Sequence, residues 1–102
     1  MDLHIDPNGA PRLVDAEALT SLRLTGTAPS PDARAALAAA GIVITDDAGH
    51  GYVEPATFSR LAGPVAADPV WQVGFAKMVA YATGKGWTDG AGRIRAHAEW
   101  DG

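Results

Sequence analysis

The chain has 102 residues, a formal net charge of −4 and no cysteine. This length suffices for a single globular domain over 1–102 with one small core, and excludes two domains. The lack of cysteine excludes disulfides, thiolate metal sites and cysteine nucleophiles. The acidic balance argues against tight binding of nucleic acid, because that affinity comes mainly from neutralised phosphates.

Hydrophobic residues make up 47% of the chain, but alanine supplies nearly half of them. An alanine buries much less apolar area than a leucine, so its burial stabilises a core less. No stretch approaches the length of a membrane-spanning helix, and the first residues lack the basic and apolar regions of a secretory signal. We therefore expect a cytoplasmic protein that does not bind membranes. Its bias towards Ala, Gly, Arg and Asp is typical of a GC-rich bacterial genome.

The first predicted element is a β-hairpin with strands at 3–5 and 12–14. Its turn reads Asp-x-x-Gly over 6–9. This sequence suits a type I turn, because Asp caps backbone N–H groups and Gly accepts the positive φ that follows. The same turn signature occurs at 46–49 and 89–92. We therefore expect two more hairpins further along the chain.

Two helices are predicted between the first two hairpins. A short one is expected over 16–23, and residues 25–29 are the best candidate for a linker. The next helix covers 31–40, because Ser30-Pro31 gives an N-cap followed by proline and Gly41 gives a stop. The second hairpin then follows, with strands at 42–45 and 51–53.

The second half of the chain predicts two helices and the last hairpin. A short helix is expected over 55–62, and a longer one over 69–84. In the longer helix, apolar residues recur at helical spacing and form one broad face. They are Trp71, Phe75, Met78 and Ala82. The last hairpin has strands at 87–88 and 93–100.

These elements predict a single α+β domain of antiparallel β-hairpins packed against about four helices. A helix followed directly by a hairpin is also how a winged helix ends, so 15–53 could contain a winged-helix-like element. A helix, a Gly stop, a strand and a Thr-Asp-x-Ala-Gly turn occur at 31–53 and again at 69–100. A duplicated unit and the chance recurrence of good turn sequences both explain this partial repeat.

His4, His50 and His97 are the only histidines, and one hypothesis is that they converge on a zinc ion. His97 lies two residues before Glu99 on a predicted strand, so both side chains share one face. The apolar residues between and beside them share the other face, which places His97 on the solvent side. The spacing of the histidines therefore favours solvent-exposed side chains, and it predicts no metal.

Motifs for enzymes and for nucleic-acid binding are weak. The serines lack a Gly-x-Ser-x-Gly elbow, and Gly84-Lys85-Gly86 lacks the first glycine and the Ser or Thr of a phosphate-binding loop. The helix at 31–40 has Arg34 as its only basic residue and no amide side chain that could read bases. We therefore expect a protein that is not an enzyme, needs no cofactor and does not bind nucleic acid.

Aromatic side chains concentrate in the last third of the chain, as Trp71, Phe75, Trp87 and Trp100. Their simplest role is the core, but aromatic residues are also enriched at binding sites. The alanine-rich helix at 31–40 presents the same alternatives: it packs inside the domain or meets a partner through Arg34 and Leu37.

We therefore predict a small protein-interaction or accessory module that binds a protein partner or forms a homodimer. The alternative is a small-molecule-binding domain with a pocket lined by Trp71, Phe75, Trp87 and Trp100. A metal or catalytic site formed by His4, His50 and His97 comes third.

Overall fold

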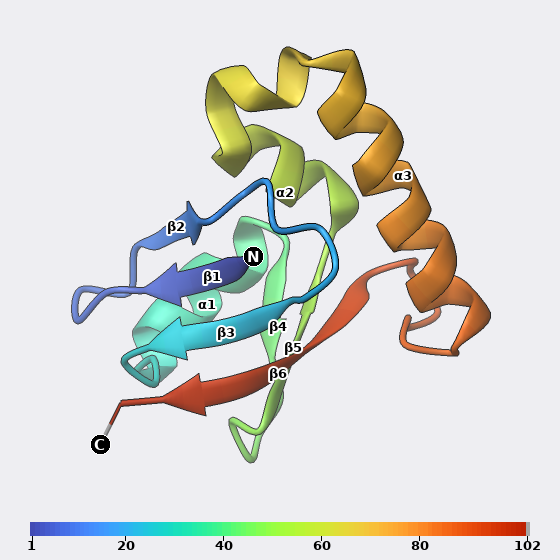
Figure 1. The fold of residues 1–102 in the computed structure, drawn as a ribbon. Helices are drawn as coiled ribbons and strands as arrows, with labels where there is room; N and C mark the ends of the chain where they lie inside the picture. Colours follow the sequence, from blue (N-terminus) through green and yellow to red (C-terminus); the bar gives the residue numbers. More distant parts are fainter. Residues whose placement is uncertain (102) are drawn as a thin grey trace.

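Within the described residues, 1–101 of this computed structural model, a curled sheet of six strands packs against three α-helices and a 3₁₀ turn (Figure 1). The strands are β1 (Asp2–Ile5), β2 (Pro11–Val14), β3 (Arg23–Gly26), β4 (Ile42–Ile44), β5 (His50–Val53) and β6 (Ile94–Trp100). The helices are α1 (Pro31–Ala39), α2 (Pro55–Ala62), η1 (Gly63–Ala67) and α3 (Pro69–Gly84). The predicted α+β class is confirmed.

The strands form one mixed sheet in the order β2-β1-β3-β6-β5-β4. β1 with β2 and β4 with β5 are antiparallel hairpins, whereas β1, β3 and β6 run parallel to one another. β6 joins the two halves of the sheet, because it pairs in parallel with β3 on one side and antiparallel with β5 of the second hairpin on the other. The first two predicted antiparallel hairpins are therefore confirmed, whereas the sheet is mixed and not wholly antiparallel as expected.

The three predicted turns are present, but in the second turn a different Asp makes the capping hydrogen bond. In the first, the Asp6 carboxylate accepts hydrogen bonds from the backbone N–H groups of Asn8 and Ala10. In the second turn, Asp47 rather than Asp46 accepts the backbone N–H of Gly49, and Ala48 takes the positive φ. The shift by one residue reflects the hydrogen bond from the Thr45 hydroxyl to Asp47, which fixes that carboxylate inside the turn.

The third predicted hairpin is shorter than expected. Thr88 makes one isolated bridge to Ile94, and no strand forms at 87–88. The physical reason is that the backbone N–H of Trp87 donates to the carbonyl oxygen of Ala82, at the end of α3. The N–H of Trp87 is therefore bound to the helix terminus and cannot pair with β6. The hairpin after α3 is limited to one bridge, unlike the β4–β5 hairpin after α1.

The helix predicted over 16–23 is also wrong. This segment forms turns and leads into β3. Along β3, the buried residues Leu24 and Gly26 alternate with the more exposed Arg23 and Thr25. Arg23, the last residue of the predicted helix, instead begins β3, which fills the position between β1 and β6. The structure therefore has three α-helices among the described residues instead of four, and the winged-helix-like element is not confirmed.

The other helices begin where their caps predict. The Ser30 hydroxyl oxygen accepts the backbone N–H of Ala33 at the start of α1, and the Asp68 carboxylate accepts that of Val70 at the start of α3. α1, α2 and α3 each have proline in the first turn. Its missing N–H costs nothing there, because the first N–H groups of a helix lack intrahelical acceptors.

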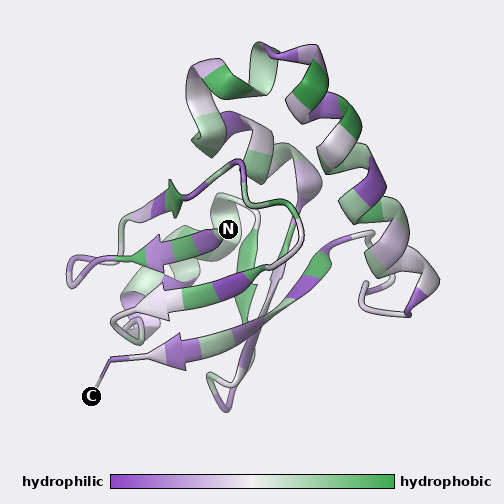
Figure 2. Ribbon diagram, in the orientation of Figure 1, coloured by the Kyte–Doolittle hydropathy of each residue, from purple (hydrophilic) through white to green (hydrophobic). Residues whose placement is uncertain are grey.

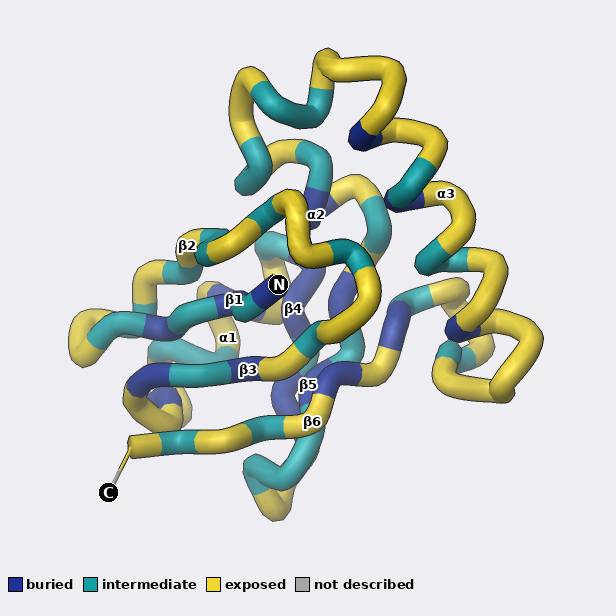
Figure 3. Tube along the Cα trace, in the orientation of Figure 1, coloured by how far each residue is buried: buried dark blue, intermediate teal, exposed yellow. Residues whose placement is uncertain are grey.

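The core lies between the sheet and the helices. Figure 2 shows hydrophobic and hydrophilic residues alternating along the strands, and Figure 3 shows the buried residues on the strands and on the inner sides of the helices. Phe58, Leu3, Ile5, Leu24, Ile42 and Val53 are fully buried. The first strands therefore supply fully buried core residues, although most of the aromatic side chains lie in the last third of the chain.

No helix among residues 1–101 is both long enough and apolar enough to span a lipid bilayer.

Candidate functional site

Helix α3 is apolar on two sides. Trp71, Phe75 and Ala82 point into the core, as the sequence predicts. Val70, Val73 and Tyr81 point away from it and are 79%, 57% and 59% exposed. With Lys77, these three lie at spacings of three and four residues, so they form one stripe along the helix. We call Val70, Val73, Lys77 and Tyr81 the outer face of α3; much of the helix is exposed in Figure 3.

A groove of about 590 Å³ adjoins this outer face. It lies between α3, the loop at 19–22 and the start of β6. Its apolar lining includes Leu19, Leu22, Met78, Tyr81, Trp87 and Ile94. Four of its polar lining residues are Thr20, Ser21, Lys77 and Arg95. The groove thus combines an apolar floor with hydroxyl groups and two cationic side chains.

Gly74 allows the loop wall of the groove to approach α3. A Cβ at Gly74 would lie 2.7 Å from Cδ1 of Leu19, so a larger residue would push the loop outwards. The indole N–H of Trp71 donates to the carbonyl oxygen of Ala16 at 2.8 Å and holds the start of the same loop. The loop is therefore attached to α3 at two points.

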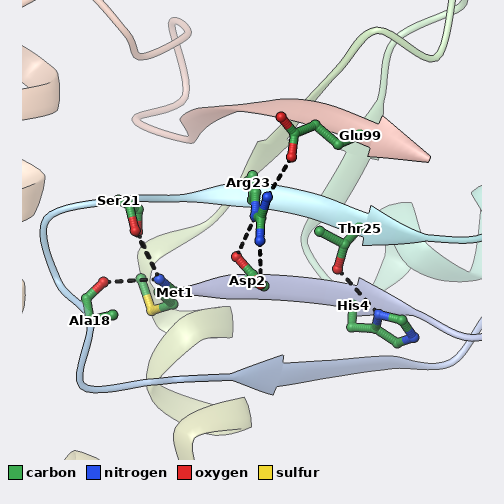
Figure 4. A network of polar contacts seen from close by, with 8 residues as sticks. All are labelled: Met1, Asp2, His4, Ala18, Ser21, Arg23, Thr25 and Glu99. Carbon is green, nitrogen blue, oxygen red and sulfur yellow. Dashed lines mark hydrogen bonds and ion pairs between the residues drawn. The ribbon is translucent and has the colours of Figure 1, made fainter. Parts of the chain in front are cut away.

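The N-terminal residue holds the loop from the other side. The amino nitrogen of Met1 donates to the carbonyl oxygens of Ala18 and Ser21, at 3.0 and 3.1 Å (Figure 4). The side chain of Met1 is buried in the core. These contacts explain why the 16–23 segment stays irregular: its carbonyl groups bond to Met1 and Trp71 instead of forming helical hydrogen bonds.

Trp87 forms the far wall of the groove. Its backbone is fixed on both sides, because its N–H donates to Ala82 and its carbonyl oxygen accepts the N–H of Arg95. Its ring stands edge-on to the ring of Tyr81, with centroids 5.7 Å apart. The Lys85 ammonium lies 5.5 Å from the centroid of Tyr81, within the range of a cation–π interaction. Trp87 remains 39% exposed.

A cluster of charged side chains, separate from the groove, lies on the face of the sheet away from the helices. The Arg23 guanidinium donates to Asp2 on β1 at 2.8 Å and to Glu99 on β6 at 2.7 Å (Figure 4). The hydrogen bond from Arg23 holds the pKa of Asp2 below its ordinary value, and the two carboxylates raise the pKa of Arg23. This cluster connects three neighbouring strands, so its role is structural.

The other shifted carboxylates belong to turns. The backbone N–H of Gly49 and the Thr45 hydroxyl hold the pKa of Asp47 below its ordinary value. Burial opposes ionisation of Asp89, but hydrogen bonds from Arg93 outweigh it and lower the pKa of that carboxyl. In both cases the lowered pKa reflects the hydrogen bonds that shape the turn.

The three histidines are not brought together. His50 and His97 face each other across β5 and β6, with ring centroids 5.5 Å apart. His4 lies on β1, where its Nδ1 is 3.2 Å from the Thr25 hydroxyl oxygen. In the part of the chain that the structure describes, no group of three His, Cys, Asp or Glu side chains could hold a metal ion.

The predicted aromatic pocket is divided between different places. Trp71 and Phe75 stack on each other inside the core, with centroids 4.8 Å apart and ring planes 7° apart. Trp100 is half-buried, and its indole N–H donates to the carbonyl oxygen of Ala48 at 2.7 Å. Of the four predicted residues, Trp87 alone lines the groove.

Helix α1 offers little at its predicted surface. Leu37 is buried in the core. Arg34 is half-buried, and its Nη1 donates to the carbonyl oxygen of Thr45 at 3.3 Å, while its Nε has no hydrogen-bond partner within the described residues. The two residues thus attach α1 to the sheet.

Sequence reasoning missed most of the groove. The sequence predicts a helix over 16–23, which would contain Leu19 and Leu22, and this helix does not form. Val70 and Val73 fall outside the predicted apolar face of α3. Two valines on the opposite side of that helix are the sequence signal that could have located the site. A helix that is apolar on both sides needs a second neighbour or an exposed apolar surface.

No known protein-family model matches this chain, and no curated protein or solved structure shows significant similarity to it.

Proposed function

We propose that this chain is a small protein-interaction module that binds its partner through the outer face of α3 and the adjoining groove. The observation that carries the proposal is the second apolar side of α3, where Val70, Val73 and Tyr81 are all more than half exposed. An amphipathic helix on a protein surface normally carries one apolar stripe, which faces the core. Grouped apolar side chains left in solvent mark interaction sites.

Two aromatic residues support this proposal. Tyr81 and Trp87 pack edge-on at the junction of the outer face and the groove. Tyrosine and tryptophan dominate binding energy at protein interfaces, because they bury large areas and lose little conformational freedom. Their backbones are held by α3 and by hydrogen bonds, so a partner would meet a preformed surface.

The groove favours a second candidate function, the binding of a small molecule. Its volume of about 590 Å³ lies within the usual range of ligand sites, and its lining is mostly apolar with a few polar groups. This site differs from the aromatic pocket expected from the sequence, since Trp71, Phe75 and Trp100 do not line it.

The test is a selection of displayed random peptides on the wild-type chain, followed by affinity measurements on two variants. Tyr81→Asp puts a carboxylate on the outer face. Ala76→Asp adds the same charge to the same helix, at an exposed position about 140° away around its axis. Selected peptides should bind the Ala76→Asp variant as well as wild type and lose most of their affinity for Tyr81→Asp.

The proposal fails if the selected peptides bind both variants equally, or if the selection yields no peptide that depends on Tyr81. Circular dichroism of both variants checks that each one is folded.

A further inference from the structure

The charge around α3 differs from that of the rest of the chain. The chain has 12 Asp and Glu residues, but none between Pro69 and Thr88, a segment that contains Lys77 and Lys85. The loop wall of the groove, at 19–22, carries no charged side chain either. The groove lining and the four residues of the outer face therefore include no carboxylate, in a protein whose net charge is −4, and Asp68 caps the helix end beside Val70.

The two cations that line the groove have no acidic partner within residues 1–101. The ion pairs of this part of the chain use Arg23 and Arg93. Lys77 on α3 and Arg95 on β6 belong to none of them, and both side chains are exposed. Their charges thus stand beside the apolar groove without compensation.

The spacing of the outer face suits a helical partner. Val70, Val73 and Lys77 follow one another at intervals of three and four residues, and Tyr81 comes four residues later. This is the spacing with which one helix packs along another. Lys77 lies in the middle of the stripe, where a partner helix would pass directly over it.

We infer that the partner contacts this surface with an amphipathic helix that carries Asp or Glu beside its apolar stripe. Its apolar side chains cover Val70, Val73 and Tyr81 and enter the groove, and its carboxylates reach Lys77 and Arg95. A second copy of this chain is a poorer match, because its outer face has lysine and its nearest carboxylate, Asp68, caps the N–H of Val70 at the end of the helix. This inference rests on the proposed function and adds the chemistry of the partner.

The experiment compares three synthetic helical peptides of about 20 residues, a length that permits stable helices. They share one apolar stripe and differ only in the flanking residues, which are Glu, Gln or Lys. Binding is followed by fluorescence anisotropy of a dye on the peptide. We expect the Glu peptide to bind about ten-fold more tightly than the Gln peptide, since the two groove cations each contribute modestly at an exposed site. High salt should reduce this preference.

Lys77→Glu should abolish the preference for the Glu peptide. Arg12→Glu is the matched control, because it makes the same change of charge at an exposed residue of β2 and should leave the preference intact.

Three results would overturn the inference, and they differ in what they leave standing. If the Gln peptide binds as tightly as the Glu peptide and both depend on Tyr81, the partner is not acidic but the proposed function stands. If no peptide binds and none selected by display depends on Tyr81, both fail. If the chain sediments at twice its 10.5 kDa and Tyr81→Asp restores the monomer, the outer face holds a second copy.

Discussion

The three tryptophans of this chain have the same indole group but different roles. Trp71 and Trp100 donate their N–H groups to backbone carbonyls of a loop and a turn, over 50 residues away in sequence. Trp87 is partly exposed and lines the groove. The sequence places all three in one region of the chain, and the fold distributes them over the core, a turn and the candidate site.

Trp71→Phe should lower the free energy of unfolding by about 1–3 kcal/mol, because it leaves the carbonyl of Ala16 without its donor and removes buried volume. Trp87→Phe is the matched control and should change stability by less than about 0.5 kcal/mol. Urea titration followed by circular dichroism measures both. Equal losses in the two variants would contradict the proposed division of roles.

The pair of Asp2 and Arg23 should make stability depend on pH. The pKa of Asp2 is lower in the folded chain than its ordinary value of 3.8, so its ionised form stabilises the fold above that pH. This stabilisation is lost as the pH falls through the lowered pKa. We therefore expect the unfolding free energy to fall less steeply with acidification in Asp2→Asn than in wild type.

Arg23→Gln should flatten the acid dependence as well, because Arg23 is the main cause of the lowered pKa of Asp2. Urea titrations between neutral pH and pH of about 3 provide the comparison. An Asp2→Asn variant that keeps the full wild-type decrease would show that other carboxylates determine it.

At the scale of single elements, prediction succeeded where a local interaction determines the structure. α1 and α3 begin directly after Ser30 and Asp68, because each of these side chains caps one N–H group three or two residues later. It failed for β3, which was not predicted, and for the pairing of β6, because the partners of both strands lie far away in sequence. Arg23 pairs in register with His97, and no local pattern encodes that pairing. The groove was missed for the same reason, since its walls come from three separate segments.

Gly26 shows how closely β3 is fitted into the sheet. It has a φ of +95°, and a Cβ there would collide with the carbonyl oxygen of Ile5. Gly26→Ala should destabilise the chain by about 3 kcal/mol or more, the sum of backbone strain and overpacking. Gly86→Ala is the control: its φ is +74° but its surroundings are open, so strain alone should cost about 1–2 kcal/mol.

The difference between the two glycine variants measures the collision with Ile5. If both variants lose the same stability in urea titration, then contact between β1 and β3 tolerates a methyl group.

At the scale of the whole molecule, the sheet has a centre and two edges. β3 and β6 are its middle strands, and β2 and β4 are its edges. The core residues come from both halves of the chain, so the core is complete only when the whole sheet has formed. The composition showed that large apolar residues are few, but it did not show that the first strands supply several of the most buried ones.

This arrangement predicts the order of hydrogen exchange. Backbone amides of β3 and β6 should exchange most slowly, through global unfolding, whereas those of β2 and β4 should also exchange through local opening at the edges. Native-state exchange measured by NMR gives the free energy of opening for each amide. Protection of β2 equal to that of β6 would contradict this view of the sheet.

The central place of β6 also has a consequence for synthesis. A nascent chain that has emerged from the ribosome as far as α3 contains both hairpins and β3. It still lacks β6, the strand that joins β3 to the second hairpin. Its two halves share no strand pairing until residues 94–100 arrive, so Leu24 and Val53 cannot complete their burial. Long-range pairing of this kind slows folding. We therefore expect the fold to be completed only after translation of β6, with apolar surface exposed on the partly made chain until then.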